Sequence, residues 1–362
     1  MKIDVKKITK VGKNTILGSK NLLLRNIKGS LRPQGLVFMV TDKCNSRCTH
    51  CNIWRQKGVD NPLTPKELEK TLSDPLFKDI REIINTGGEA TLRTDLEEIF
   101  LAEHKALPKA NLQLSTNALI PQRTVDLAKA LLKRGIPLSI GISLDGVGEH
   151  HDKVRGVKGN FERVDWLVQE LTKLKEIYKD KLNFGFGFTL STLTVDYMKE
   201  TQEYGKKVGV DVLIQPYSQA NFYSNIGREL SKTDKKLLDA AKSLPPSFIY
   251  ESWLSSMETE GKFIKFPCFA LHTFCALKTN GDIVPCLNLF ESSAGNVREK
   301  TPTEIWKSKE AQEIRKTIKN CSGCLNQWGS GWSLESCSFP GIFFYLTHPI
   351  RLLERFKKRG IE

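Results

Sequence analysis

The sequence lacks a run of about 18 uncharged apolar residues, the length that predicts a membrane-spanning helix. It also lacks an apolar stretch behind its charged first residues, so we expect no secretory signal and a cytoplasmic location. No internal repeat and no low-complexity segment is evident. The length of 362 residues suits one large α/β domain with a smaller one attached, or a barrel with extensions. The hydrophobic fraction of 40% and the charged fraction of 27% are ordinary for a soluble globular protein.

Isolated cysteines are also absent, because the nine cysteines fall into two groups. The first group is Cys44, Cys48 and Cys51, and the second is Cys268, Cys275, Cys286, Cys321, Cys324 and Cys337. A reducing cytoplasm disfavours disulfides, so both groups are candidate metal sites.

Positive charge is concentrated at the two ends of the chain. Of a net charge of +14, residues 1–32 contribute nine Lys or Arg against one Asp, and residues 341–362 contribute five against two acidic residues. Apolar residues interleave these charges, which indicates two basic amphipathic segments. Such segments either dock on an anionic membrane or a nucleic acid, or pack on the domain as terminal helices, and the sequence leaves both open.

A strand followed by a helix recurs six times before residue 217. The expected strands are the apolar segments 36–40, 80–85, 112–116, 138–144, 183–190 and 211–215. Parallel strands need long crossover connections, so this alternation predicts an α/β fold whose parallel sheet is either flat or curved into a partial (β/α)6 barrel. In both cases ligands bind where the carboxyl ends of the strands meet.

The alternation stops after residue 217, and a boundary is expected near residue 245. We therefore expect four parts: a basic N-terminal segment (1–34), a barrel (35–244), a small cysteine-rich α+β domain (245–340) and a basic C-terminal tail (341–362).

The first cysteine group has three thiols on one loop, separated by three and two residues. This spacing suits three irons of a [4Fe–4S] cluster and leaves the fourth iron free for a chelating small molecule. A structural zinc site is the alternative, but its fourth ligand would be His50, which lies beside Cys51 where joint chelation is awkward. The spacing therefore favours a cluster that starts one-electron chemistry.

Glycine and polar residues follow the next strands at the ends where ligands bind. The second strand ends in Gly87-Gly88-Glu89, where two glycines let the backbone approach a ligand and the carboxylate can accept hydrogen bonds from an ammonium group. Further segments of this kind are Ser115-Thr116-Asn117, Ser143-Leu-Asp145-Gly146 and Arg155-Gly156-Val-Lys-Gly159-Asn-Phe161.

In combination these segments resemble the radical S-adenosylmethionine (SAM) superfamily over about residues 35–217. The resemblance implies a partial (β/α)6 barrel whose three-cysteine cluster cleaves SAM reductively to a 5′-deoxyadenosyl radical. His50 stands where that family usually has an aromatic residue, and Ala90 where it has proline. The implied SAM contacts are His50, Gly87, Gly88, Glu89, Ser115, Asn117, Ser143, Asp145 and Arg155.

The second cysteine group begins on an expected hairpin, with a strong turn signal at Asn280-Gly281 and a cysteine on each arm. The region resembles the SPASM/twitch extension of radical SAM enzymes, which holds auxiliary [4Fe–4S] clusters. Ser330 and Leu334 stand where that pattern has two further cysteines. Six thiols allow two clusters with three ligands each, or one cluster that we assign to Cys268, Cys275, Cys286 and Cys337.

The sequence thus predicts a radical SAM enzyme, an oxidoreductase or radical-based modification enzyme, with at least one auxiliary cluster and an external flavodoxin- or ferredoxin-like reductant. The SPASM resemblance implies a peptide, protein or carbohydrate substrate, whereas the basic termini indicate a lipid-linked one at the inner face of a membrane. We expect Gln215, Tyr217 and Asn221 to contact this substrate. The alternative is a zinc-stabilised nucleic-acid-binding protein, suggested by the net charge of +14 and the paired cysteines.

Overall fold

The computed structural model describes residues 31–230, 234–244 and 267–321, together with residues 21, 23–25, 250, 253, 254, 257, 331, 333 and 336. The expectation of membrane docking rests on residues 1–34 and 341–362, and most of the first segment and all of the second lie outside the described residues. The thiols of Cys324 and Cys337 lie outside them as well. No helix in the described part of the chain combines the length and the apolar character needed to cross a membrane.

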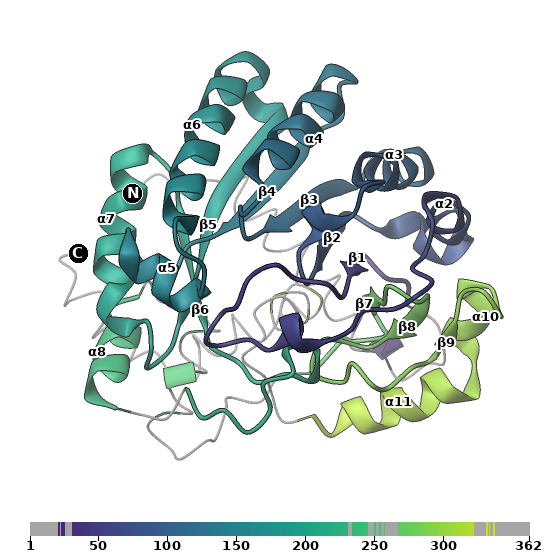
Figure 1. The fold of residues 1–362 in the computed structure, drawn as a ribbon. Coiled ribbons are helices and arrows are strands. Elements are labelled where there is room, and N and C mark those ends of the chain that lie inside the picture. The colour runs from purple at the N-terminus through teal and green to yellow at the C-terminus, as the bar shows by residue number, and fades with distance from the viewer. Residues whose placement is uncertain are drawn as a thin grey trace, which may run out of the picture.

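A nine-stranded sheet with the order β6-β5-β4-β3-β2-β1-β7-β8-β9 forms the centre of the molecule. The first six strands are all parallel, and they curve into the partial barrel that the sequence predicts (Figure 1). Their bounds are β1 (Gly35–Thr41), β2 (Glu82–Gly87), β3 (Asn111–Thr116), β4 (Leu138–Ser143), β5 (Leu182–Leu190) and β6 (Val212–Pro216).

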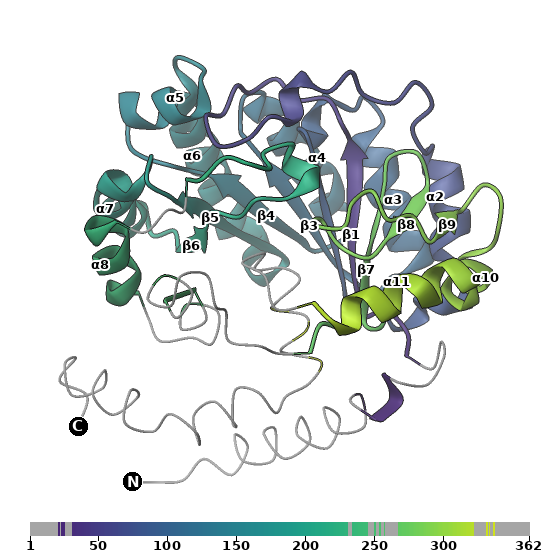
Figure 2. The ribbon, with the colours of Figure 1, turned by 90° about the horizontal axis from the view of Figure 1, so that it is seen from below.

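Helices cover the outer face of this curved sheet (Figures 1 and 2). Buried and accessible residues alternate along β2, β3 and β4, because one side of each strand packs on helices and the other faces the barrel interior. The helices are α2 (Pro65–Leu72), α3 (Leu96–Ala106), α4 (Pro121–Lys133), α6 (Asn160–Tyr178), α7 (Met198–Val208), α8 (Lys235–Ser243) and a short α5 (Glu149–Arg155) that the sequence analysis does not predict.

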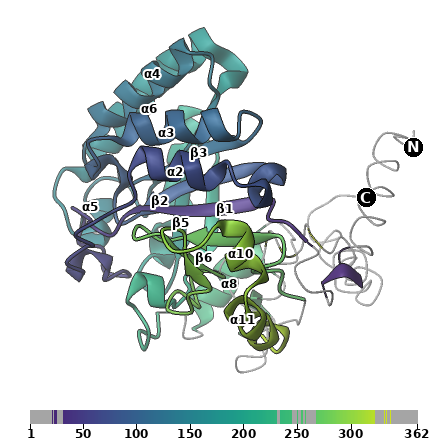
Figure 3. The ribbon, with the colours of Figure 1, turned by 90° about the vertical axis from the view of Figure 1, so that its right-hand side faces the viewer.

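The cysteine-rich region continues the same sheet. Its first strand, β7 (Phe274–Leu277), pairs parallel with β1, and the expected hairpin follows as β8 (Asp282–Val284). The chain continues through β9 (Gly295–Asn296), α10 (Pro302–Lys307) and α11 (Lys309–Lys319). Figure 3 shows α10 following α4, α3 and α2 along the outside of the sheet. Apolar residues of α10 and α11 share the main core with those of α2 and α3, so the barrel and the cysteine-rich region are built around one core.

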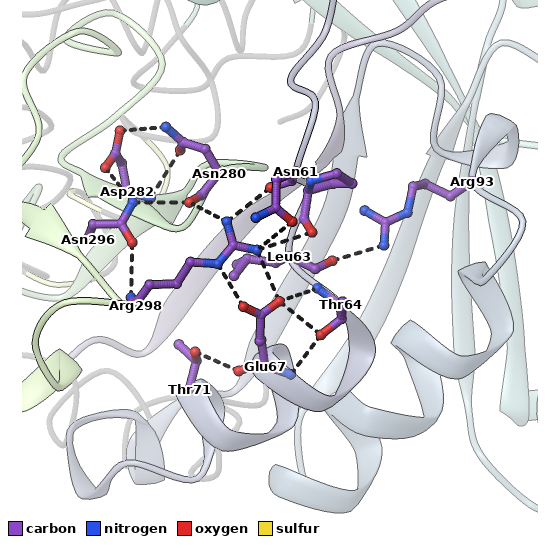
Figure 4. A network of polar contacts seen from close by, with 11 residues as sticks. Asn61, Leu63, Thr64, Glu67, Thr71, Arg93, Asn280, Asp282, Asn296 and Arg298 are labelled. Atoms are coloured by element: carbon purple, nitrogen blue, oxygen red, sulfur yellow. Dashed lines mark hydrogen bonds and ion pairs between the residues drawn. The ribbon is translucent and has the colours of Figure 1, made fainter.

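Arg298, just after β9, ties the hairpin to the start of α2 (Figure 4). Its guanidinium donates to both carboxylate oxygens of Glu67 at 2.7 and 3.0 Å and to the backbone oxygen of Asn61 at 3.0 Å. Glu67 also completes a capping box with Thr64, the N-cap residue of α2. The Arg298 guanidinium lowers the pKa of Glu67 to about 2, which keeps this planar ion pair intact down to acidic pH.

A carboxyl group lies in the core between β2 and α3. Asn85 Nδ2 donates to Glu103 Oε2 at 2.8 Å, and both side chains are fully buried. The amide oxygen of Asn85 and the second carboxyl oxygen of Glu103, Oε1, find no hydrogen-bond partner among the described residues. Burial raises the pKa of Glu103 to about 8, so the side chain is a neutral carboxylic acid at pH 7.

This buried acid predicts a stability that depends on pH. Because the folded-state pKa of Glu103 is raised, its contribution is fully present below the unfolded pKa of 4.5 and is lost as the pH rises through about 8. The wild-type free energy of unfolding should therefore fall by up to about 5 kcal/mol over this window. Glu103→Gln, which cannot ionise, should lose this slope in urea unfolding.

The exposed neighbour Glu98→Gln is the matched control and should keep the wild-type pH profile. A Glu103→Gln variant that still loses stability as steeply as the wild type between about pH 5 and about pH 8 would contradict the assignment.

Candidate active site

A cavity of about 610 Å³ begins at the carboxyl ends of the parallel strands and continues along the inner face of β3–β6. The structure brings together at this cavity nearly all the residues that the sequence analysis selects. Its lining includes Cys44, His50, Cys48, Cys51, Gly87, Gly88, Glu89, Ser115, Asn117, Ser143, Arg155, Gln215 and Tyr217. The lining does not include Asp145 or Asn221.

The end of α5 holds the cysteine loop in place. The backbone oxygen of Arg155 accepts from Ser46 Oγ at 2.9 Å and from Arg47 N at 3.0 Å. Gly156 caps α5 in the left-handed conformation, and a Cβ on it would lie 2.5 Å from the backbone oxygen of Arg47. Only glycine therefore fits where the helix meets the loop, which explains why Gly156 follows Arg155 in the sequence.

The thiols of Cys44 and Cys51 are protonated when they bind no metal. Burial raises the pKa of Cys44 to about 11 and that of Cys51 to about 12, and the neighbouring cysteines add to both shifts. Cys48 Sγ lies 3.5 Å from Arg155 Nη1 and 3.1 Å from Ser46 Oγ, so two polar groups face this sulfur. Thiolates are the ligating form, so iron must displace these protons, and the guanidinium favours that change.

The donor set of the loop fits a [4Fe–4S] cluster. Cys44, Cys48 and Cys51 are free cysteines that line one cavity. A [4Fe–4S] cluster takes each thiolate on a different iron, so these three thiols can hold three of its four irons.

Two glycines bring the end of β2 against the cysteine loop. Gly88 N donates to Thr41 O at 2.7 Å, and Glu89 N donates to Lys43 O at 2.8 Å. A Cβ on Gly87 or Gly88 would lie 2.2 or 2.1 Å from one of these backbone oxygens. Any larger residue would force the strand end away from the cluster loop, so this glycine pair is a steric requirement of the site.

Glu89 joins the ends of β2 and β3. Its Oε1 accepts from Thr116 Oγ1 at 2.8 Å and from Thr91 Oγ1 at 2.6 Å, and its Oε2 accepts from Asn117 N at 2.7 Å. Burial raises the pKa of Glu89, and these hydrogen bonds oppose the rise. The carboxylate therefore has a structural task in addition to the cofactor contact that the resemblance implies.

Arg155 lines the cavity and keeps one side-chain donor without a partner among the described residues. Its Nη1 lies 3.3 Å from Asp145 Oδ2, and Asp145 Oδ1 accepts from Thr189 N at 2.8 Å. Asp145 thus lies behind Arg155 and orients it, although the sequence analysis expects a direct SAM contact from both. Arg155 Nε is buried and has no hydrogen-bond partner among the described residues, which suits a carboxylate ligand.

His50 reaches the cavity with a neutral ring. Burial lowers its pKa to about 4, and its Nδ1 has no hydrogen-bond partner in the described part of the chain. Asn225 Nδ2 donates to the backbone oxygen of His50 at 3.2 Å and to that of Ser218 at 3.2 Å. Ser46 and Asn225 support the site, but as single polar residues in loops they gave no sequence signal.

A short aromatic segment, η6 (Asn221–Tyr223), connects the two cysteine-bearing regions. Tyr223 O lies 3.8 Å from Cys51 Sγ, and Phe222 N donates to Leu287 O at 3.3 Å. The Phe222 and Phe290 rings lie 5.2 Å apart in one apolar cluster, against which Cys44 and Cys51 pack. Asn221 is exposed at the start of this segment and does not line the cavity, so the structure does not place it where a substrate contact is expected.

The described cysteines of the second group separate onto the two faces of β7. Cys275 is fully buried in the helix-covered core with Leu36 and Leu277. Cys268 and Cys286 pack on the other side, against the cluster that contains Phe274. Burial raises the pKa of Cys268 to about 11, and the proximity of Cys286 and Cys321 adds to the rise. The structure thus groups Cys268 with Cys286 and Cys321, and places Cys275 apart from them.

Two family models match the chain in the regions that hold these sites. Residues 38–204 match the radical SAM superfamily, and residues 268–325 match SPASM, an iron–sulfur cluster-binding domain.

Relatives and solved structures agree with these matches. Fe-coproporphyrin III synthase of Methanosarcina barkeri is 31% identical over 44% of this chain and 38% of that protein, so the match spans less than half of that relative. AdoMet-dependent heme synthase of the same organism is 24% identical over 77% of this chain and 83% of that protein. The crystal structure of Streptococcus suis SuiB bound to SAM has the same fold, with a TM-score of 0.60 and 19% identity over 89% of this chain and 79% of that one.

Family membership implies a [4Fe–4S] cluster and SAM as cofactors, and the SPASM match implies an auxiliary iron–sulfur cluster. The site geometry and the family matches lead to the same conclusion: this chain is an enzyme of the radical SAM superfamily with a C-terminal SPASM domain.

Proposed function

We propose that this enzyme cleaves SAM reductively and uses the product to remove a hydrogen atom from a substrate bound in the barrel. The observation that carries the proposal is that Cys44, Cys48 and Cys51 line one cavity with the glycine pair, Glu89 and Arg155. When bound, the cluster supplies one electron to SAM, whose cleavage gives methionine and a 5′-deoxyadenosyl radical.

The residues around the cluster have separate tasks in holding SAM. Arg155 Nε, which has no partner among the described residues, would donate to the methionine carboxylate, and the backbone after Gly87 together with Glu89 would accept from the ammonium group. Ser143 and Asn117 supply polar contacts from the ends of β4 and β3. Holding a reactant in one geometry lowers the entropic cost of the reaction, so these groups act by orientation.

We further propose that Cys268, Cys286 and Cys321 are ligands of the auxiliary cluster, and that a cysteine beyond residue 321 completes the set. The support is that Cys268 and Cys286 pack on one face of β7 and that Cys321 lies near enough to raise the pKa of both thiols. Such a cluster can accept the electron released when a substrate radical is oxidised, and the Phe222 contact keeps its region packed against the Cys51 end of the active loop. The electron that starts each turnover comes from an external flavodoxin- or ferredoxin-like protein.

The charges in the cavity bear on the class of substrate. The relatives' names point to coproporphyrin and heme, whose several carboxylates favour cationic partners. Among the described residues that line the cavity, Arg155 and Lys175 are the cations, and Arg155 already faces Asp145 and Cys48. We therefore propose an uncharged polar substrate, such as a peptide segment or a carbohydrate offers, and do not assign a tetrapyrrole.

Anaerobic purification and one SAM assay test the proposed function. The protein should be brown, its visible absorption should be bleached by dithionite, and SAM with dithionite should yield methionine and 5′-deoxyadenosine. A colourless, zinc-loaded protein that leaves SAM intact would overturn the proposal and favour the zinc-stabilised nucleic-acid-binding alternative, whose binding should weaken steeply with salt.

A further inference from the structure

The inner wall of the barrel is built in rows, because neighbouring parallel strands are in register. Ser143 of β4 aligns with Gly187 of β5, which aligns with Leu213 of β6. This upper row lies at the end of the barrel where the cysteine loop is, and all three residues line the cavity. Leu213 is 54% exposed, so its side chain projects into open space.

The next row down has almost no side chains. It consists of Ser115 of β3, Gly141 of β4 and Gly185 of β5, which are paired across the sheet. A Cβ on Gly141 or Gly185 would have no neighbour closer than 3.6 or 3.5 Å, and one on Gly187 above them would have none within 4 Å. Backbone crowding therefore does not require these glycines, and their effect is to keep the lumen open below the catalytic end.

The lower row is polar and lies near the amino ends of the strands. Gln113 of β3 aligns with Ser139 of β4, which aligns with Asn183 of β5, and all three line the same cavity. The side-chain amides of Gln113 and Asn183 have no hydrogen-bond partner among the described residues. Ser143 comes four positions after Ser139 in β4, which corresponds to about 13 Å along the strand.

Away from the cysteine loop, the cavity lining carries one cation, Lys175, and one anion, Asp211. The register that pairs Gly187 with Leu213 places Asp211 level with Gly185, one row above the polar lower row. An anionic group would meet the Asp211 carboxylate as well as the ammonium group of Lys175. Amide side chains, in contrast, offer both donors and acceptors to an uncharged polar group.

We infer that Gln113, Ser139 and Asn183 form a distal subsite for the uncharged, hydrogen-bonding end of an elongated substrate. The reacting part of that substrate lies at the upper row, and its middle passes over the glycine row. This inference rests on the proposed function and extends it, because it assigns a length of about 13 Å beyond the reacting position and an amide or hydroxyl end group.

The test uses holoenzyme with SAM and without reductant, so that binding is measured apart from reaction. Acetyl-tetraglycine amide, acetyl-tetraglycine with a free carboxylate, and maltotriose are the probes, and equilibrium dialysis gives their dissociation constants. Four extended residues span about 13 Å, which matches the distance between the rows. Either acetyl-tetraglycine amide or maltotriose should bind at least tenfold more tightly than the probe with a free carboxylate. Whether the amide probe or the hydroxyl probe binds more tightly identifies the end group of the substrate.

Two variants locate the binding. Asn183→Ala removes an amide from the lower row, and Gly185→Val fills the gap above it without a close contact, so each should weaken binding of the preferred probe at least tenfold. Gln169→Ala removes an amide on the outside of α6 and should leave the affinity unchanged, and thermal melting checks that all variants fold.

Equal binding of the carboxylate probe, absence of binding by every probe, or unchanged affinity in Gly185→Val would each overturn the subsite. Wild-type formation of 5′-deoxyadenosine is assayed in parallel. Failure of SAM cleavage alone therefore identifies a failure of the proposed function and not of the subsite.

Discussion

Replacing Cys44, Cys48 and Cys51 together by alanine should reduce 5′-deoxyadenosine formation from SAM to background. These thiols line the cavity with Arg155 and Glu89, and no other described cysteine does. Without them the cluster that supplies the electron has no protein ligands. Anaerobic incubation with SAM and dithionite, followed by chromatography of the products, measures the loss.

Iron content separates loss of the active cluster from loss of the fold. The triple variant should keep its auxiliary iron, because Cys268 and Cys286 pack in a different cluster of buried residues. Ser46→Ala is a suitable partial variant: it removes the hydroxyl that lies 3.1 Å from Cys48 Sγ and that donates to Arg155 O, and should lower activity without removing iron. Formation of 5′-deoxyadenosine at the wild-type rate in the triple variant would refute the assignment.

Cys268→Ala should release the auxiliary iron, whereas Cys275→Ala should retain it. Cys268 is half-buried and lies near Cys286 and Cys321, whereas Cys275 is fully buried in the helix-covered core beside Leu36 and Leu277. In that core a thiol acts as a small apolar group, so its truncation should cost about 1–2 kcal/mol of stability through a small cavity.

Iron per chain, measured in the background of the triple variant, reports the auxiliary site alone. Urea unfolding of Cys275→Ala measures the cost of the cavity. Loss of iron in Cys275→Ala with an unchanged unfolding midpoint would show that Cys275 is a ligand. It would then support the four-cysteine set of Cys268, Cys275, Cys286 and Cys337 that the sequence predicts.

Local patterns predict most of the barrel and much of the site. The six strands and the Thr64 cap of α2 follow from apolar runs and capping chemistry, which act within a few residues. The glycine pair and the cysteine loop each follow a strand, and a parallel sheet brings the carboxyl ends of neighbouring strands together. Their proximity is therefore predictable as well. The residues that line the upper cavity were therefore accessible to sequence reasoning.

The remaining features depend on contacts between distant segments. Cys275 and Cys286 lie on the two arms of one hairpin. The face of the sheet to which Cys275 points, however, is set by the pairing of β7 with β1, which joins residues over 200 positions apart in the chain. Asp145 was expected at the ligand because its position matches a motif, whereas the structure uses it to hold Arg155. The short α5 was missed because a helix of seven residues has too little periodicity to be recognised.

The pairing of β7 with β1 also limits how this enzyme can be divided. All seven residues of β1 are buried, and the strand is hydrogen-bonded on one side to β2 and on the other to β7. A barrel cut at the expected boundary near residue 245 would leave Gly35–Thr41 as an apolar edge strand with unpaired backbone groups, a template for aggregation. The auxiliary region therefore also covers the edge of β1, and the barrel depends on this cover to stay soluble.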